Sequence, residues 1–364
     1  LGWKSSYVNA DISTEFFDQV QTEWIKDNNL SNEFRYSELT NAAYANMDFM
    51  LSEKLSAQLG LRAEQNRGEG EQIDRDTAFV RENIQLFPTA FLAYNPSETH
   101  SFGLSYGRRI ERPEYESINP YRQYQDEFSF QEGNVNLLPQ LTDNVEFNFL
   151  GWDGLLSASA YYNNVQGVIM ETISQNLETK ALITRPENVA QSEVYGASIN
   201  LDLRPAKFLM TSLYVNGYNS KTSGIINDDN FSLEQPTISG SMINRIRLGG
   251  DWSVATLLRY YSKTINGTYL RDPYGEFFFF VQKKLMDNRA SLRLSFYDVF
   301  NWKENVGVSD FQNIYVSQNE QWQTRFVRLS FSYRFRNGKV SRIKRLESSN
   351  TEENSRIKSE SLED

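Results

Sequence analysis

The chain has 364 residues, with 47 Asp and Glu against 37 Lys and Arg, a net charge of -10 and no Cys. The acidic balance argues against a nucleic-acid-binding protein, which needs a basic surface, and the lack of Cys excludes disulfide bonds and thiolate metal sites. A mean hydropathy of -0.57 and the absence of an apolar run of about twenty residues exclude a transmembrane helix, although not a membrane β-strand, which offers only every second side chain to lipid.

The first predicted strands are joined by a short turn at one end and a long polar loop at the other. Residues 3–16 form a first strand, an acidic loop follows at 18–38, and residues 39–51 return. A turn at 52–54 leads into a strand at 55–64, in which apolar and polar side chains alternate with a period of two. The connections therefore differ in length at the two ends of the strands.

The strand at 55–64 has one apolar and one polar face. Its apolar face consists of Leu55, Ala57, Leu59, Leu61 and Ala63. Arg62 lies on the polar face. Because an Arg that faces lipid at mid-bilayer costs about 2–4 kcal/mol, we expect Arg62 to point into the interior of a barrel.

The same pattern continues to residue 335 and gives about fourteen strands in all. The other strands are predicted at residues 84–94, 101–107, 144–149, 156–162, 195–203, 208–219, 237–248, 252–263, 274–283, 290–297 and 326–335. Further short turns are predicted at residues 95–98, 152–154, 204–206, 249–250 and 286–288. Further long loops are predicted at residues 66–82, 108–143, 171–191, 220–235, 264–273 and 301–321.

Aromatic residues make up 14% of the chain and recur at both ends of these strands. Those beside the short turns are Tyr94, Trp152, Trp252, Tyr333 and Phe335. Those on the long-loop side are Tyr106, Tyr162, Tyr218, Tyr260 and Trp302. Two aromatic girdles are typical of an outer-membrane β-barrel and not of a soluble sandwich. We therefore expect an all-β, antiparallel, up-and-down transmembrane barrel in the outer membrane, with long extracellular loops and short periplasmic turns.

The barrel is expected to occupy residues 1–336, and a segment of another kind follows it. Residues 337–364 begin with a basic cluster and continue as Ser, Glu and Asn with almost no apolar side chains, which predicts a disordered periplasmic tail. Contact with a periplasmic partner or with anionic headgroups is the alternative to a solvated tail. The chain begins Leu-Gly-Trp, without an initiator Met or signal peptide. Since a barrel has to be exported, we expect an N-terminal part to precede it.

A dense motif follows the strand at 101–107. It reads Arg-Arg-Ile-Glu-Arg-Pro at 108–113, Tyr at 115, Ile-Asn-Pro-Tyr at 118–121, Glu-Gly-Asn at 132–134 and Leu-Leu-Pro-Gln-Leu-Thr at 137–142. This arrangement resembles the outer-membrane β-barrel family of TonB-dependent receptor-like proteins. Val135 and Gln140 depart from the family's pattern, and Ile118 replaces its usual Leu conservatively.

The resemblance implies a Gram-negative receptor with about twenty-two strands around an N-terminal plug. About eight strands, the plug and the TonB-binding segment would then precede residue 1. The implied activity is uptake of a bound substrate with energy passed from the inner membrane by TonB. The implied partners are outer-membrane lipid, the TonB system through the N-terminal part, a surface lipoprotein, and an unidentified small-molecule or oligomeric substrate. No cofactor is implied.

The motif residues have an architectural interpretation and a ligand-facing one. They are Arg108, Arg109, Arg112, Pro113, Tyr115, Asn119, Pro120, Gly133, Asn134 and Pro139. We expect the three Arg residues to leave the end of the strand and bind carboxylates of neighbouring loops or of the plug. The Pro and Gly residues would fix the bends of the loop. We favour the architectural interpretation, in which the loop folds back into the barrel mouth.

The last predicted strand is expected to close the barrel and to carry the signal for membrane insertion. Its apolar residues are Val327, Leu329, Phe331, Tyr333 and Phe335. The outer-membrane assembly machinery selects an apolar last strand with an aromatic end. We expect Phe335 to supply that end despite the tail.

Other protein classes find less support in the sequence. The only His, His100, lies beside a predicted short turn, and no cluster of His and carboxylates suggests a metal site. We therefore expect no enzyme, no catalytic residue and no bound metal. The pairs Asp228–Asp229 and Glu352–Glu353 are interpreted as solvated charge. The alternative to a receptor is a structural or adhesive barrel, or a self-contained fourteen-stranded channel, that binds partners through its loops.

Overall fold

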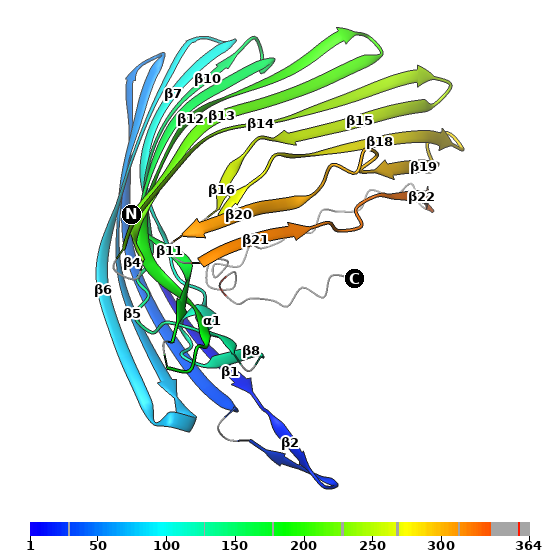
Figure 1. Ribbon diagram of the computed structural model, residues 1–364. Helices are drawn as coiled ribbons and strands as arrows, with labels where there is room; N and C mark the ends of the chain where they lie inside the picture. The colour runs from blue at the N-terminus through cyan, green and yellow to red at the C-terminus, as the bar shows by residue number, and fades with distance from the viewer. Residues whose placement is uncertain are drawn as a thin grey trace.

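Most of the strands form one strongly curved sheet whose main path is antiparallel. The computed structural model describes residues 1–27, 30–126, 128–176, 178–226, 229–266, 269–311, 314–335 and 356. Within these residues the largest sheet has sixteen strands, of which β8 and β9 branch from the main path. The main path, in sheet order, consists of β1 (Gly2–Thr14), β4 (Asn32–Ser52), β5 (Leu55–Gln72), β6 (Thr77–Ser97), β7 (His100–Glu111), β10 (Gln140–Gly151), β11 (Leu156–Gln175), β12 (Leu182–Ala206), β13 (Leu209–Ile226), β14 (Asp229–Gly249), β15 (Trp252–Tyr261), β18 (Tyr274–Leu285), β19 (Ala290–Tyr297) and β22 (Phe326–Tyr333). The expected up-and-down meander of about fourteen strands is confirmed (Figure 1).

The main path ends in two edge strands. In the described part of the chain, β1 pairs only with β4, and β22 pairs only with β19. Figure 1 shows the sheet curving from the blue strands at one end to the orange strands at the other. The first and last strands therefore each keep one row of backbone groups without a strand partner.

Side-chain alternation divides the sheet into an outer and an inner face. On β5, Leu59 and Leu61 are about half exposed on the outer face, whereas Glu64 on the opposite face is buried. Arg62 shares the inner face and forms an ion pair with Glu64. The predicted interior position of Arg62 is therefore confirmed.

The short turns are hairpin turns between successive strands of the main path, and two of them begin later than predicted. β6 continues through Pro96 to Ser97, and β12 continues through Pro205 to Ala206. Both ladders are irregular next to these positions. Because Pro lacks the N–H group that a regular ladder needs, it disturbs the pairing without ending the strand.

At the other side of the sheet the strands run further than predicted. β5 reaches Gln72 and β6 starts at Thr77, so most of the predicted loop at 66–82 is strand. The predicted loops at 171–191 and 220–235 are shortened in the same way. Polar side chains pair across these extensions, as Gln65 does with Glu82 at 2.7 Å. Cross-strand polar pairs stabilise strands beyond the apolar band, so the tips continue as hairpins.

The remaining connections contain short elements of their own. The connection after β1 holds the hairpin of β2 (Phe17–Val20) and β3 (Glu23–Lys26). The connection after β7 holds α1 (Tyr115–Ile118), β8 (Arg122–Asp126) and β9 (Ser129–Glu132). A separate four-stranded sheet consists of β16 (Thr264–Asn266), β17 (Tyr269–Arg271), β20 (Asn305–Phe311) and β21 (Ile314–Glu320). No described helix is long and apolar enough to cross a membrane.

One predicted girdle residue, Tyr218, faces inward. It stands opposite Gly196 in the β12–β13 ladder, and the residue before Gly196, Tyr195, is 53% exposed on the outer face. Alternation therefore places Tyr218 on the inner face, and Tyr195 takes the outer position. The prediction was wrong because residues 208–219 alternate irregularly, which hid their register. Tyr162 and Tyr260 are exposed as expected.

The C-terminal end of the sheet is its most exposed part. Val327, Leu329 and Phe331 on β22 are each more than 60% exposed. Phe335 lies just beyond β22, and its ring contacts that of Tyr333 at a centroid distance of 4.8 Å. The predicted tail lies outside the described residues except for Arg356, which is buried. The domain boundary after residue 336 therefore stays a prediction.

Candidate functional site

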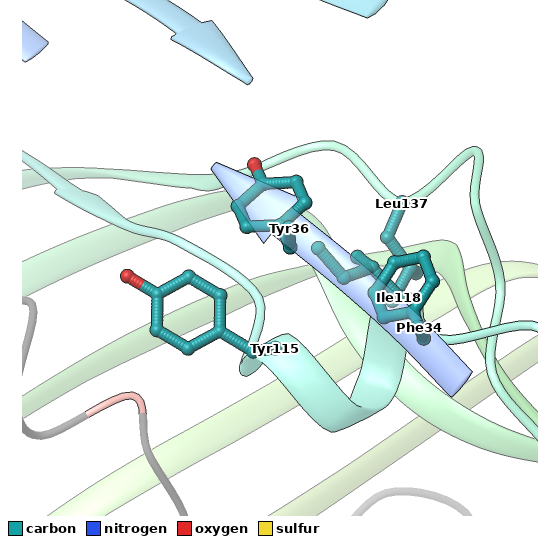
Figure 2. Packing of buried hydrophobic residues seen from close by; sticks show 5 residues of the cluster. All are labelled: Phe34, Tyr36, Tyr115, Ile118 and Leu137. Carbon is teal, nitrogen blue, oxygen red and sulfur yellow. The ribbon is translucent and has the colours of Figure 1, made fainter. Parts of the chain in front are cut away.

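The connection between β7 and β10, which carries the sequence motif, packs against the inner face of β4. Tyr115 and Ile118 from α1 and Leu137 contact Phe34 and Tyr36 of β4 (Figure 2). All five side chains are at most 4% exposed. Burying an apolar side chain contributes about 1.5–3 kcal/mol, so this cluster holds the connection, which we call the inner loop (residues 112–139), inside the barrel.

An ion pair fixes the start of the inner loop to the wall, by which we mean the inner face of the main-path strands. Arg112 donates from Nη2 to Glu64 Oε2 at 3.2 Å, and their side chains are only 6% and 1% exposed. Glu64 also binds Arg62 on the same strand. A buried carboxylate is stable only when it is paired and hydrogen-bonded. The two Arg residues supply both conditions for Glu64.

The bends of the inner loop depend on Gly133. Its amide donates to the carbonyl oxygen of Asn119 at 3.0 Å, and the Asn134 amide donates to that of Ser117 at 2.7 Å. A Cβ at position 133 would clash with the Asn119 carbonyl and lie 2.8 Å from the Ser117 oxygen. Only Gly allows this close approach of backbone to backbone. Pro120 follows α1 and Pro139 precedes β10.

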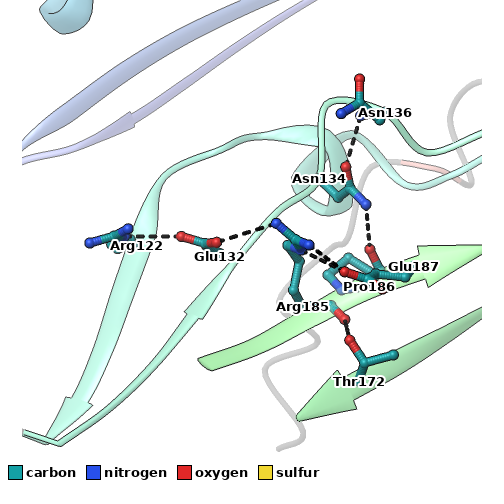
Figure 3. A network of polar contacts seen from close by, with 8 residues as sticks. All are labelled: Arg122, Glu132, Asn134, Asn136, Thr172, Arg185, Pro186 and Glu187. Atoms are coloured by element: carbon teal, nitrogen blue, oxygen red, sulfur yellow. Dashed lines mark hydrogen bonds and ion pairs between the residues drawn. The ribbon is translucent and has the colours of Figure 1, made fainter. Parts of the chain in front are cut away.

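The far end of the inner loop is tied to β12. β9 pairs in parallel with the start of β12, and Glu132 accepts from Arg122 at 2.9 Å and approaches Arg185 of β12 at 3.8 Å (Figure 3). The Asn134 side chain donates to the carbonyl of Pro186 at 3.0 Å. These contacts join the inner loop to a strand that is distant in sequence, and together they hold the loop in one position.

Two further side chains of the wall hold the loop backbone. Arg81 of β6 donates to the carbonyl of Leu137 at 2.6 Å. Asn188 of β12 accepts from the Leu138 amide at 2.7 Å and donates to the Leu138 carbonyl at 2.8 Å. The loop is thus bound on both sides of the interior.

The tip of the β8–β9 hairpin is closed by Asp126. Its carboxylate accepts from the Ser129 hydroxyl and from the Phe128 amide, both at 2.7 Å. The hydrogen bond from Ser129, followed by that from Phe128, holds the pKa of Asp126 below its ordinary value. The carboxylate therefore acts as an ionised turn cap.

Arg108 and Arg109 do not leave the strand as predicted. β7 continues to Glu111, so both residues lie within the β7–β10 ladder. Arg108 forms a bidentate pair with Asp143 directly opposite, at 2.9 and 2.8 Å, and Tyr106 donates to the same carboxylate at 2.7 Å. This cross-strand pair extends the ladder, and it lies on the same outer face as Tyr106.

Arg109 faces inward and borders a cavity of about 520 Å³. Lys4 and Arg62 also line this cavity, together with the rings of Tyr44 and Phe87. Glu64 offsets part of this positive charge. Guanidinium and ammonium groups beside aromatic rings favour an anionic ligand. In the part of the chain that the structure describes, no cluster of His, Cys, Asp or Glu could hold a metal ion.

Sequence reasoning missed the wall residues that hold the loop. Phe34, Tyr36 and Glu38 were expected in or beside the first acidic loop, and Glu64 was noted only as part of a polar face. All four are buried on the inner face. The sequence signal that could have revealed a strand was the alternation of Phe34 and Tyr36 with the polar residues Glu33, Arg35 and Ser37.

Comparison with known proteins agrees with this architecture. A family model described as "Outer membrane protein beta-barrel family" matches residues 1–333. A search of curated protein sequences gave no match.

Several solved structures are similar in fold. The copper transporter OprC has a TM-score of 0.62 at 13% identity and covers 91% of this chain and 53% of its own. The ferric yersiniabactin uptake receptor FyuA from Yersinia pestis has a TM-score of 0.62 at 11% identity, covering 90% and 50%. The FrpB iron transporter from Neisseria meningitidis has a TM-score of 0.55 at 14% identity, covering 90% and 55%. The chain thus spans about half the length of the solved structures it matches.

Proposed function

Because the chain belongs to the outer-membrane β-barrel family, we propose that it is the barrel portion of a TonB-dependent outer-membrane receptor that takes up a bound ligand. The observation that carries this proposal is the inner loop. Arg112 and a five-residue apolar cluster hold the inner loop against the inner face of β4 and β5, where it narrows the interior. In this proposal the loop or its ligand moves when energy passed by TonB reaches the barrel, which a self-contained open channel would not need.

The edge strands support the same proposal. Backbone groups left unsatisfied in lipid cost several kcal/mol each, so a sheet ending in β1 and β22 is not stable in a bilayer unless further strands pair with both. A larger barrel of about twenty-two strands would supply them. The solved structures of similar fold are themselves receptors and transporters.

The cavity bordered by Arg109 suggests the class of ligand. Lys4, Arg62 and Arg109 surround it with positive charge, so we propose an anionic ligand or an anionic metal complex. The other proposed partners are the TonB system and outer-membrane lipid, which the apolar outer face contacts.

Genetic epistasis tests this function even while the ligand is unidentified. In-frame deletions of this gene, of the TonB gene and of both would be compared for growth on a panel of metal and carbon sources. We expect both single deletions to lose growth on the same source, with no further loss in the double deletion. A TonB deletion that grows normally on the source that this gene's deletion cannot use, or a double deletion that grows worse than either single deletion, would contradict the proposal.

A second candidate function, partner binding through the loops, is favoured by one observation. The β2–β3 hairpin exposes Phe17, Val20, Trp24 and Ile25, each between 47% and 66%. An isolated hairpin is at best marginally stable in water, so these side chains suit a surface lipoprotein or another protein partner. Deleting residues 17–26 would abolish partner binding but not TonB-dependent growth if adhesion and uptake are separate.

A further inference from the structure

Two buried carboxylates occupy neighbouring strands of the wall but are neutralised in different ways. Glu64 on β5 is paired with Arg62 and Arg112. Glu38 on β4 has a side chain that is only 3% exposed. Its hydrogen-bond partner in the wall is neutral: the Tyr36 hydroxyl donates to Glu38 Oε2 at 3.0 Å. A hydroxyl does not neutralise a buried charge, so Glu38 needs a cation from elsewhere.

That cation comes from the far end of the chain. Arg356 Nη1 donates to Glu38 Oε1 at 2.7 Å, across a separation of 318 residues. Among the described residues it is the only ion-pair partner of Glu38. The Arg356 side chain is itself only 8% exposed.

The inner loop provides the other contacts of the Arg356 side chain. Its Nε donates to the carbonyl of Pro113 at 2.9 Å, and its guanidinium carbon lies 4.3 Å from the centroid of the Tyr115 ring. The Tyr115 amide also donates to the Arg356 carbonyl at 3.5 Å. A carboxylate, a carbonyl and an aromatic face thus surround one planar cation.

This arrangement selects a guanidinium over an ammonium group. The two hydrogen bonds leave from different nitrogens of a rigid fork, and the flat face of the same group stacks on a ring. A Lys ammonium is a compact, strongly hydrated point charge without a flat face, so it matches the carboxylate, the carbonyl and the ring less well. The site therefore favours an arginine side chain.

We propose that Glu38, the Pro113 carbonyl and the Tyr115 ring form a guanidinium-binding site in the barrel interior, and that Arg356 of the same chain is its ligand. Two elements of the site, Pro113 and Tyr115, belong to the inner loop, so binding of Arg356 also stabilises the docked loop. The inference is independent of the proposed transport function, because it concerns only the contacts within this chain.

Chemical modification with phenylglyoxal, which reacts with accessible guanidinium groups, tests the site directly. The chain would be labelled in isolated outer membranes, and the rates at Arg356 and at Arg67 would be read by peptide mass spectrometry. Arg67 is the internal reference because its side chain is 53% exposed and, within the described residues, forms an ion pair with the exposed Glu69. We expect Arg356 to react more slowly than Arg67 by about tenfold or more, as a charge-assisted hydrogen bond to a buried carboxylate implies.

The Glu38→Gln variant should bring the rate at Arg356 close to that at Arg67. Glu33→Gln is the matched control, because Glu33 lies on the same strand but its side chain is 41% exposed, and it should leave Arg356 protected. Heat-modifiable migration on gels would confirm that each variant is folded. If Glu38→Gln does not fold, Tyr115→Leu removes the stacked ring instead and should raise the rate.

Two results would overturn the proposal. The first is an Arg356 that reacts as fast as Arg67 in the unmodified chain, a comparison that needs no variant to fold. The second is an Arg356 that stays protected when Glu38 is neutralised or the Tyr115 ring is removed in a folded barrel.

Discussion

Two polar connections of the chain, both with large apolar side chains, differ in how far they are buried. The connection after β1 forms the β2–β3 hairpin, in which all eight strand residues are exposed. The inner loop after β7 is docked in the interior, with Tyr115, Ile118 and Leu137 at most 2% exposed. Both segments contain large apolar side chains, including Trp24 in the hairpin. Apolar content alone therefore does not decide whether a loop is buried.

The difference lies in what each connection meets. The inner loop contacts a wall of complementary shape and charge. Its apolar residues pack on Phe34 and Tyr36, and Arg112 forms an ion pair with Glu64. Among the described strands, β2 and β3 pair only with each other. A loop is thus docked when several independent contacts of the wall favour the same position, and removing those contacts one by one should turn the inner loop into a segment like the hairpin.

The largest effect is expected from Arg112→Ala, which leaves Glu64 buried with one partner fewer. Breaking a buried ion pair costs about 3–5 kcal/mol, enough to undock the loop. Chymotrypsin should then cleave after Tyr115, which is protected while the loop is docked. Arg108→Ala is the matched control because Arg108 binds Asp143 within the ladder, and cleavage after Tyr115 should not increase. Equal cleavage in the two variants would contradict the account.

The second effect tests the apolar cluster through two neighbouring leucines. Leu137 is fully buried, whereas Leu138 is 62% exposed. Leu137→Ala should destabilise the docked loop by about 2–5 kcal/mol because it opens a cavity. Leu138→Ala, like Trp24→Ala in the hairpin, should change stability by about 0.5 kcal/mol or less. Hydrogen exchange of the loop measures the loss of stability in each variant. Equal losses for Leu137→Ala and Leu138→Ala would show that the apolar cluster does not hold the loop.

The third effect tests the close backbone approach at Gly133. Gly133→Ala should cost about 1–3 kcal/mol, as overpacking does, because the added Cβ meets the Asn119 and Ser117 carbonyls. Gly217→Ala is the control: a Cβ at position 217 meets nothing within 4 Å, so this change should be neutral or slightly stabilising. Loss of loop protection in both variants would mean that the loop responds to general strain and not to this contact.

The smallest effect on the docking of the inner loop is expected from Phe335→Asp. Phe335 is 91% exposed, so its loss should change folding stability by about 0.5 kcal/mol or less and leave the inner loop docked. Its predicted role lies in membrane assembly, and the amount of barrel in the outer membrane should fall. Ending the chain after Gly338 keeps Phe335 but also removes Arg356, so the amount of barrel should stay above that of Phe335→Asp, although the inner loop should be less stably docked. The reverse pattern, measured by immunoblots of membrane fractions, would refute the role of Phe335.

The faces of the sheet could be predicted from the sequence because they follow from a strict period of two. Leu59 and Leu61 outside and Arg62 inside are set by alternation and by the cost of a charge in lipid. The ends of the strands could not be predicted as well. Beyond the bilayer neither face contacts lipid, so the polar extensions of β5 and β6 show no apolar row to mark them as strand.

The candidate site was predicted only in part. The sequence motif drew attention to the inner loop, which packs against the inner face of β4, and the choice between an architectural and a ligand-facing role stays a prediction. The contacts of the motif residues could not be predicted, because Glu64, Phe34 and Arg185 are distant in sequence and carry no local pattern that reveals a partner. The three Arg residues look equivalent in the motif. Strand alternation places Arg108 on the outer face and Arg109 on the inner face of β7. Arg112 follows the strand and belongs to the inner loop.

Amide hydrogen exchange over the two connections tests the central claim, that the inner loop is docked against the wall while the β2–β3 hairpin is not. The Gly133 and Asn134 amides donate to carbonyls within the loop. In isolated outer membranes, peptides covering residues 115–138 should exchange much more slowly than peptides covering 17–26, and Arg112→Ala should remove most of that difference. If both connections exchange at the same fast rate in the unmodified chain, the inner loop is not docked and the account is wrong.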